Sequence, residues 1–158
     1  MSLNPREFRD AVGSFATGVC VITANPQGIE PFGMTVNSFA SVSLDPALVL
    51  WSIQNDSDCF EAFEQAKGFT VNVLAEDQRD ISNQYAKKNQ HELSKEHYRL
   101  GKTATPVLRG AVSSLECEVW ARYPGGDHTI IVGKVLEMSY NRNEEPLVFH
   151  AGQYGAIR

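Results

Sequence analysis

The segment most informative about the fold reads Gly33-Met34-Thr35-Val36-Asn37-Ser38-Phe39-Ala40-Ser41-Val42-Ser43-Leu44-Asp45-Pro46. Short side chains that donate and accept hydrogen bonds lie between apolar ones here, and no formal charge occurs before Asp45. A strand that only had to pack would combine apolar residues with arbitrary polar ones. We therefore interpret the segment as a strand that faces the polar edge of a planar heteroaromatic ligand. The alternative is an ordinary loop rich in serine and threonine.

Length and composition predict one globular domain that spans residues 1–158. The chain is 42% hydrophobic and 21% charged, and a chain of 158 residues can bury a hydrophobic core without disulfides or structural metals. A net charge of −5 and the lack of a Lys/Arg block argue against nucleic-acid binding. No apolar run approaches membrane-spanning length, and the first residues lack the apolar core of a signal peptide. We expect no nucleic-acid or membrane partner.

The cysteines predict the redox compartment. Cys20, Cys59 and Cys117 are odd in number and widely spaced, and they form no CxxC or metal-ligand pattern. We therefore expect reduced thiols in a cytoplasmic protein, and no metal site.

The spacing of apolar residues predicts a mainly β fold with a few helices. Helices are expected over residues 5–17, over 60–66 with Asp56 or Ser57 as N-cap and Gly68 as its end, and over 76–88. Strands are expected over 19–24, from 31 through the segment quoted above, and over 48–53, 69–74, 111–122, 128–139 and 147–150. Residues 89–105 are polar without a clear period, and we expect an excursion loop there. Short strands with hairpin-sized gaps favour a small antiparallel barrel.

Two strands carry further expectations. In residues 111–122, Glu116, Glu118 and Trp120 are expected to share a solvent-facing side. Residues 130–132 read Ile-Ile-Val and are apolar on both faces, which in a small barrel predicts either a covering partner subunit or a covering N-terminal helix.

The motifs that are missing narrow the chemistry. The sequence has no GxSxG elbow, no HExxH, no P-loop and no glycine-rich turn opening a helix after a strand. These absences argue against the common hydrolases and against a Rossmann dinucleotide site. Hydride transfer between two stacked rings needs no protein acid or base in the transfer step, because the protein only has to orient the rings. A polar strand in a chain poor in catalytic motifs is compatible with that role.

The run from Gly33 to Phe39 and the following Ser-Val-Ser-Leu-Asp-Pro resemble the signature of the short-chain flavin reductases, the reductase components of two-component monooxygenases. The resemblance extends from about Phe8 to Tyr154. It implies a Greek-key split β-barrel of the FMN-binding type, usually a homodimer with its sites at the subunit interface. It also implies FMN or FAD as the flavin and NADH or NADPH as the reductant.

The resemblance also implies which residues bind the cofactor. The isoalloxazine edge and the ribityl chain would be contacted by Thr35, Val36, Asn37 and Ser38. Two further residues of the same match lie beside these four, Ala40 and Ser41. Ser52, Gln54 and Ser57 would hold the flavin phosphate at the start of a helix, although Ser57 is equally suited to be an N-cap. The family often has Ser-x-Thr where this chain has Ser57-Asp58-Cys59, and an inward-pointing Asp58 would repel a phosphate.

Two more residues are implied by resemblance. Gly126-Asp127-His128 is similar to the family's Gly-Asp-His motif, and His128 is expected to position the nicotinamide. A lone histidine at the start of a strand would otherwise be interpreted as a surface imidazole. Tyr154 matches a C-terminal segment that commonly reads Gly-Arg-Tyr, with Gln153 in place of the arginine, so the choice between NADH and NADPH stays open.

The sequence therefore predicts an NAD(P)H-dependent flavin reductase whose reduced flavin diffuses to a separate oxygenase. One alternative is a split-barrel oxidase that holds its flavin tightly. Another is a flavin-binding carrier or sensor without enzymatic activity. Oxidation of the nicotinamide that depends on added free flavin would separate the first interpretation from both alternatives.

Overall fold

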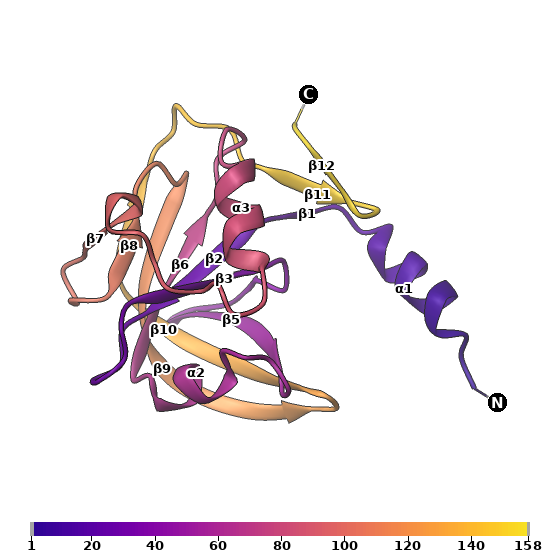
Figure 1. Cartoon of the computed structure of the whole chain (residues 1–158), viewed down its shortest axis with the longest axis horizontal. Coiled ribbons are helices and arrows are strands. Elements are labelled where there is room, and N and C mark those ends of the chain that lie inside the picture. Colours follow the sequence, from indigo (N-terminus) through magenta and orange to yellow (C-terminus); the bar gives the residue numbers. More distant parts are fainter. Residues whose placement is uncertain (1, 158) are drawn as a thin grey trace.

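A computed structural model describes residues 2–157 of the chain. Its centre is a seven-stranded antiparallel sheet in the order β3-β2-β6-β9-β10-β5-β4 (Figure 1). These strands are β2 (Cys20–Ala24), β3 (Phe32–Val36), β4 (Ala40–Leu44), β5 (Ala47–Gln54), β6 (Gly68–Val73), β9 (Ser113–Gly125) and β10 (His128–Tyr140). The predicted mainly β fold, with antiparallel strands and few helices, is confirmed.

Two smaller sheets flank the large one. The first joins β1 (Thr17–Gly18), β11 (Val148–His150) and β12 (Gln153–Gly155), and the second pairs β7 (Tyr98–Leu100) with β8 (Pro106–Leu108). The sequence predicted the strand at residues 147–150, but it did not identify β12 in the tail. The excursion from residue 89 is largely irregular, as predicted, and it also contains a short 3-10 helix, η1 (Lys95–His97), and β7.

Residues 33–46, which were expected to belong to one strand, belong to two strands. Residues 37–39 separate the two, so that β3 and β4 lie at opposite edges of the seven-stranded sheet. The predicted continuous strand was therefore wrong. Alternation of polar and apolar residues in the sequence does not reveal where the chain changes its partner strand, because both strands have the same period of two residues.

The three helices are shorter than predicted. Helix α1 (Pro5–Gly13) ends four residues before the expected position, and α2 (Phe60–Gln65) ends before Gly68. Helix α3 (Arg79–Ala86) lies within the expected range of residues 76–88 but ends before Lys87 and Lys88. Gly68 begins β6 instead of closing α2. The N-cap position of α2 is Cys59, although the Ser57 hydroxyl accepts the Cys59 N–H in the preceding turn.

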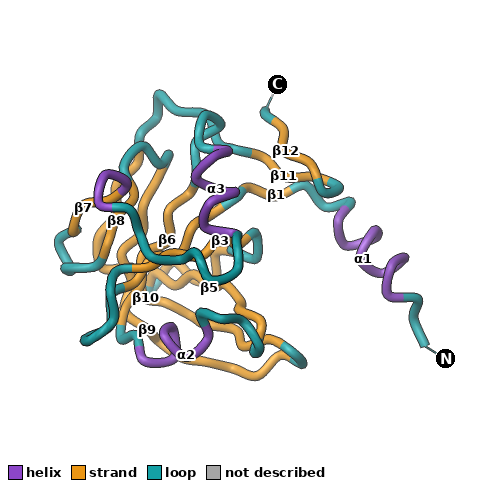
Figure 2. The backbone as a smooth tube through the Cα atoms, in the orientation of Figure 1, coloured by secondary structure: helices purple, strands orange, loops and turns teal. Residues whose placement is uncertain are grey.

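Helix α1 extends away from the rest of the molecule, while α2 and α3 lie against it (Figures 1 and 2). Asn4 caps α1 by accepting the N–H groups of Arg6 and Glu7, but no residue of the helix is buried. The side chains of Phe8 and Val12 are more than half exposed. Of the helices within residues 2–157, none is long and apolar enough to cross a membrane.

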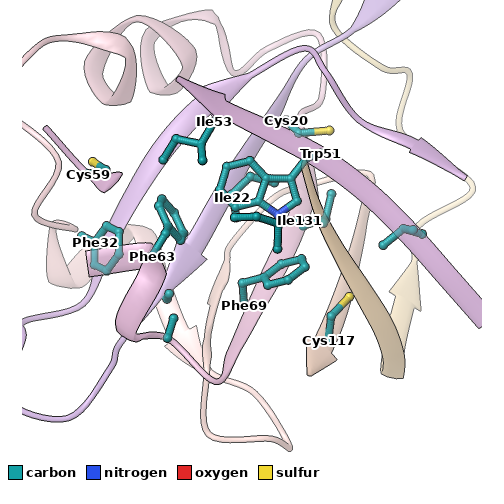
Figure 3. Close-up of a cluster of buried hydrophobic side chains, with 14 residues drawn as sticks. Cys20, Ile22, Phe32, Trp51, Ile53, Cys59, Phe63, Phe69, Cys117 and Ile131 are labelled. Carbon is teal, nitrogen blue, oxygen red and sulfur yellow. The ribbon is translucent and has the colours of Figure 1, made fainter. Parts of the chain in front are cut away.

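The interior of the barrel is an aromatic cluster centred on Trp51 (Figure 3). The rings of Phe63 and Phe69 meet the indole edge to face, with ring centroids 4.8 and 5.8 Å away. Such pairs add about 0.5–1.5 kcal/mol each beyond their area burial. Gly133 allows this packing, because a Cβ there would lie 2.4 Å from a ring carbon of Phe69. The core thus fixes β5 against β6 and β10.

The outer face of β2 and β6 is also buried, beneath the excursion. Asn72 is the centre of a polar network there: its amide group donates to Val21 O and Thr23 Oγ1, and its Oδ1 accepts from Leu108 N and Ser114 Oγ. Each of these distances is 2.9 or 3.0 Å. The network therefore ties β8 to the large sheet.

Glu116 differs from the sequence prediction. It was expected on a solvent-facing side with Glu118 and Trp120, but it is only 7% exposed and accepts hydrogen bonds from the Thr103 backbone and hydroxyl. Glu118 and Trp120 are exposed as predicted. The excursion covers the Glu116 side of the strand, and simple alternation could not indicate that cover.

Candidate functional site

Most of the residues predicted to bind a cofactor line one cleft, here called the central cleft, of about 260 Å³. Its lining consists of the end of β3 and the following turn, the end of β5, the turn before α2 and the first residue of β10. The residues are Met34, Thr35, Val36, Asn37, Ser38, Ser52, Ile53, Gln54, Ser57 and His128. Polar side chains from three separate parts of the sequence, residues 34–38, 52–57 and 128, thus converge on one surface.

Strand pairing explains this convergence. The first residue of β10, His128, lies directly opposite Gln54 at the end of β5. The Ser38 hydroxyl donates to Ser52 O at 3.1 Å and accepts from Ser52 N at 3.0 Å, which holds the turn between β3 and β4 onto β5. Ser38 thus has a structural role whether or not it touches a ligand.

Two further clefts adjoin the central one. The Lys88 cleft, about 400 Å³, shares Met34, Thr35, Gln54 and Ser57 with it. Its other lining residues are Asp56, Asp58, Ala86, Lys88 and His91. The Tyr154 cleft, about 210 Å³, shares Thr35, Val36 and Asn37 with the central cleft. Thr35 lines all three clefts, so the clefts adjoin one another around this residue.

Tyr154 lies in the Tyr154 cleft and is fixed by helix α3. Its hydroxyl is 2.6 Å from Ser82 Oγ and donates to Asn83 Oδ1 at 2.9 Å. Thr35 is tied to the same helix, because its hydroxyl donates to Ser82 O at 2.7 Å. Helix α3 therefore sets the position of both side chains, and Ser82 is a contributor that the sequence analysis missed.

The turn that carries His128 is held by a residue that the sequence analysis also missed. Asn55 accepts from the Thr129 hydroxyl at 2.7 Å, and its backbone N–H donates to Asp127 O at 2.8 Å. His128 Nδ1 lies 2.7 Å from Asp127 Oδ1, and this hydrogen bond lowers the pKa of Asp127. Asn55 thus anchors the hairpin tip, and Asp127 orients the imidazole.

The predicted ligands Ala40 and Ser41 lie apart from these clefts. Both residues are exposed on β4, opposite Leu50 and Val49 of β5, and neither lines any of the three clefts. Their contact with a ligand stays a prediction. Lys88 and His91, which no motif marked, do line the region. The sequence alone does not distinguish a charged residue that faces a cleft from one on the solvent-exposed surface.

Asp58, Cys59 and His91 bring potential metal-ligating atoms within 4.8 Å of one another. His91 Nε2 is 3.0 Å from Asp58 Oδ1, and His91 Nδ1 is 3.0 Å from Gly33 O, so hydrogen bonds engage both ring nitrogens. Burial raises the pKa of the Cys59 thiol to about 12, which makes it a poor ligand. This group is better described as a hydrogen-bonded pair beside an inert thiol.

Comparisons with known proteins identify the family of the chain. The model of the flavin reductase like domain matches residues 12–158. An FMN reductase (NADH) of Agrobacterium fabrum is 44% identical over 153 residues, which are 96% of this chain and 86% of the relative. The reductase subunit HsaB of a flavin-dependent monooxygenase of Rhodococcus jostii is 35% identical over 156 residues, which are 99% of this chain and 80% of the relative.

A solved structure is similar over its whole length. The NADH:FAD oxidoreductase SgcE6 of Streptomyces globisporus, in complex with NAD and FAD fragments, superimposes with a TM-score of 0.91 at 33% identity. The alignment covers 100% of this chain and 97% of the other.

Proposed function

The chain belongs to the flavin reductase-like domain family, and from this premise we propose how its residues carry out the family's reaction. It is an NADH-dependent reductase of FMN or FAD that supplies reduced flavin to a monooxygenase. Its relatives include an NADH-dependent FMN reductase and an NADH:FAD oxidoreductase, so they favour NADH, which the sequence left open, and leave both flavins possible.

The observation that carries the site proposal is the content of the central cleft. Thr35, Asn37 and Gln54 supply hydroxyl and amide groups along its wall, and none of them is charged. Such groups can donate to and accept from the alternating carbonyl and N–H groups of an isoalloxazine edge. The residues present therefore fit a flavin. The adjoining Lys88 cleft offers Ser57 and the Lys88 cation to the phosphate end, beside the acidic Asp56 and Asp58.

When bound, the flavin supplies the hydride acceptor and NADH the donor. The protein's residues bind and orient the two rings, and no residue needs to transfer a proton in that step. We assign His128, the first residue of β10, to the nicotinamide. The β3 turn, with Val36, Asn37 and Ser38, is assigned to the flavin. Tyr154 is assigned to the outer end of the region.

Residues 1–158 are proposed to act as one flavin reductase-like domain, and two copies to form a homodimer. The apolar side chains of Phe8 and Val12 on α1 are exposed within one chain. This exposure supports a second copy of the chain as the partner that covers α1. The N-terminal helix, which was the alternative cover expected for residues 130–132, extends away from the sheet (Figure 1). Ile131 and Val132 are nonetheless only 3% and 7% exposed within one chain, so these residues do not by themselves require a partner subunit. Light scattering at micromolar concentration should give a dimer. A monomer would contradict the assignment.

The monooxygenase is proposed to receive reduced flavin by diffusion. Three free, buried cysteines support a reducing, cytoplasmic location.

Steady-state NADH oxidation with FMN, FAD and riboflavin compared side by side tests this function. We expect turnover that depends on the concentration of added free flavin. A tightly held flavin with no response to added flavin would favour the split-barrel oxidase instead. Flavin binding without NADH oxidation would favour a carrier or sensor.

A further inference from the structure

The Lys88 cleft contains a charge that conflicts with an anionic ligand. Asp58 is part of its wall, next to Ser57. Burial would raise the pKa of Asp58, but the hydrogen bond from Asn89 and the charge of His91 outweigh burial and lower it. Asp58 is therefore ionised at neutral pH, and its charge must be compensated if a phosphate is to enter.

His91 provides the compensation. Its side chain is only 11% exposed, and its Nε2 lies 3.0 Å from Asp58 Oδ1. Its Nδ1 lies 3.0 Å from the carbonyl oxygen of Gly33. A carbonyl oxygen and an ionised carboxylate can both only accept hydrogen bonds, so each ring nitrogen must carry a proton. The geometry thus describes an imidazolium cation.

The backbone fixes where this cation lies. Gly33 N donates to His91 O and Leu93 N donates to Pro31 O, both at 2.8 Å, so residues 91–93 pair with the start of β3. The pairing requires a glycine, because a Cβ at position 33 would lie 2.9 Å from Val21 and 3.2 Å from Leu93. The imidazolium is consequently held to the strand that carries Thr35.

The charge balance of the cleft depends on this residue. Its lining has two acidic residues, Asp56 and Asp58, and two basic ones, Lys88 and His91. With the imidazolium the formal charges cancel, and without it one negative charge is left over. The neighbouring Cys59 thiol has its pKa raised to about 12 and contributes no charge, while Glu92 is exposed and does not line the cleft.

We propose that His91 is a positioning residue that cancels the charge of Asp58 and so lets the Lys88 cleft accept a phosphorylated flavin. The inference rests on the proposed function, because it concerns the phosphate end of that ligand. Riboflavin has no phosphate, so its binding to the central cleft should not depend on the pair.

Fluorescence titrations of FMN and riboflavin test the proposal with the full chain. The His91→Gln variant should weaken FMN binding about tenfold or more, because Asp58 is left unpaired, while riboflavin affinity changes less than about twofold. The double variant Asp58→Asn with His91→Gln should recover most of the FMN affinity. His150→Gln, an exposed histidine on β11, is the matched control and should leave both affinities unchanged.

Other results would overturn the proposal. Equal losses for FMN and riboflavin would mean that His91 only supports the fold. If the double variant did not recover FMN affinity, the unpaired charge of Asp58 would not be the cause of the weaker binding.

A second readout does not involve flavin. Nitrogen-15 NMR of the protein without ligand should show both ring nitrogens of His91 as hydrogen-bond donors, one to Gly33 O and one to Asp58, and a ring with an unprotonated nitrogen would contradict the inference by itself. If wild-type protein bound neither flavin although His91 was an imidazolium, the proposed function would fail while the pair itself was verified.

Discussion

Nδ1 of His128 lies 2.7 Å from a carboxylate oxygen of Asp127, its neighbour at the turn between β9 and β10. This hydrogen bond lowers the pKa of Asp127, so the carboxylate is ionised and Nδ1 carries the proton. Nε2 is then the ring nitrogen left for a ligand in the central cleft. The pair therefore sets both the orientation and the tautomer of the imidazole.

Replacing His128 with alanine should mainly raise the KM for NADH. A residue that binds the ground state and the transition state equally well affects KM, whereas one that acts only in the transition state lowers kcat. Some loss of kcat is also expected, because a displacement of about 1 Å can slow transfer about a hundredfold. Flavin affinity should be nearly unchanged, since the proposed flavin contacts lie on β3, β5 and the turn before α2.

Steady-state kinetics with both substrates varied, together with a flavin titration, would measure these effects. The His150→Ala variant, at an exposed position of β11, serves as the control. If His128 were only a surface imidazole, its kinetic constants would match those of the parent, and the Gly-Asp-His resemblance would be reduced to turn chemistry.

Asn55→Ala should have a smaller effect of the same kind. The variant removes the acceptor for the Thr129 hydroxyl, and one hydrogen bond contributes roughly 0.5–1.5 kcal/mol, or about two- to tenfold in KM for NADH. Thr129→Val removes the donor of the same bond and should give a matching change. An effect on flavin affinity larger than the effect on the KM for NADH would show that Asn55 does not act through His128.

Asn37→Ala should weaken flavin binding. An unmade hydrogen bond in a ligand site costs roughly 1–3 kcal/mol, which is about tenfold or more in the dissociation constant. Quenching of flavin fluorescence measures the change, and Asn143→Ala, exposed in the turn before β11, is the control. Unchanged affinity in a folded Asn37→Ala protein would remove the flavin from the β3 turn.

The sequence was informative about the strands and much less so about what covers them. Runs of β-branched and other apolar residues located β2, β5 and β10, clean alternation located β6, and the motif resemblance identified most of the residues of the central cleft. The residues that hold the site in place, Asn55, Ser82 and His91, had no signal, because their partners are backbone groups or residues far away in the sequence. Glu116 was misassigned for the same reason.

The buried thiols predict the stability of the protein at alkaline pH. Burial raises the pKa of Cys20 from 9.0 to about 12. As the pH rises above 9, the unfolded chain releases this proton first, so the free energy of unfolding falls until the folded-state pKa is reached. The slope from one such group is about 1.4 kcal/mol per pH unit.

Denaturant unfolding of wild-type and Cys20→Ala protein across this pH range isolates the contribution of the thiol. The difference between the two free energies of unfolding should shrink or reverse in favour of the variant as the pH rises. Parallel curves would mean that the thiol ionises freely in the folded protein.

The most direct measurement for the whole account is anaerobic reduction of equimolar free FMN by NADH, followed through the visible absorbance of oxidised flavin. The wild-type protein should bleach the flavin rapidly. Asn37→Ala should require more FMN for the same rate, and His128→Ala should require more NADH. Two results would contradict the assignment of separate flavin and nicotinamide residues in the central cleft. One is that wild-type protein leaves the absorbance unchanged. The other is that each variant needs more FMN and more NADH by the same factor.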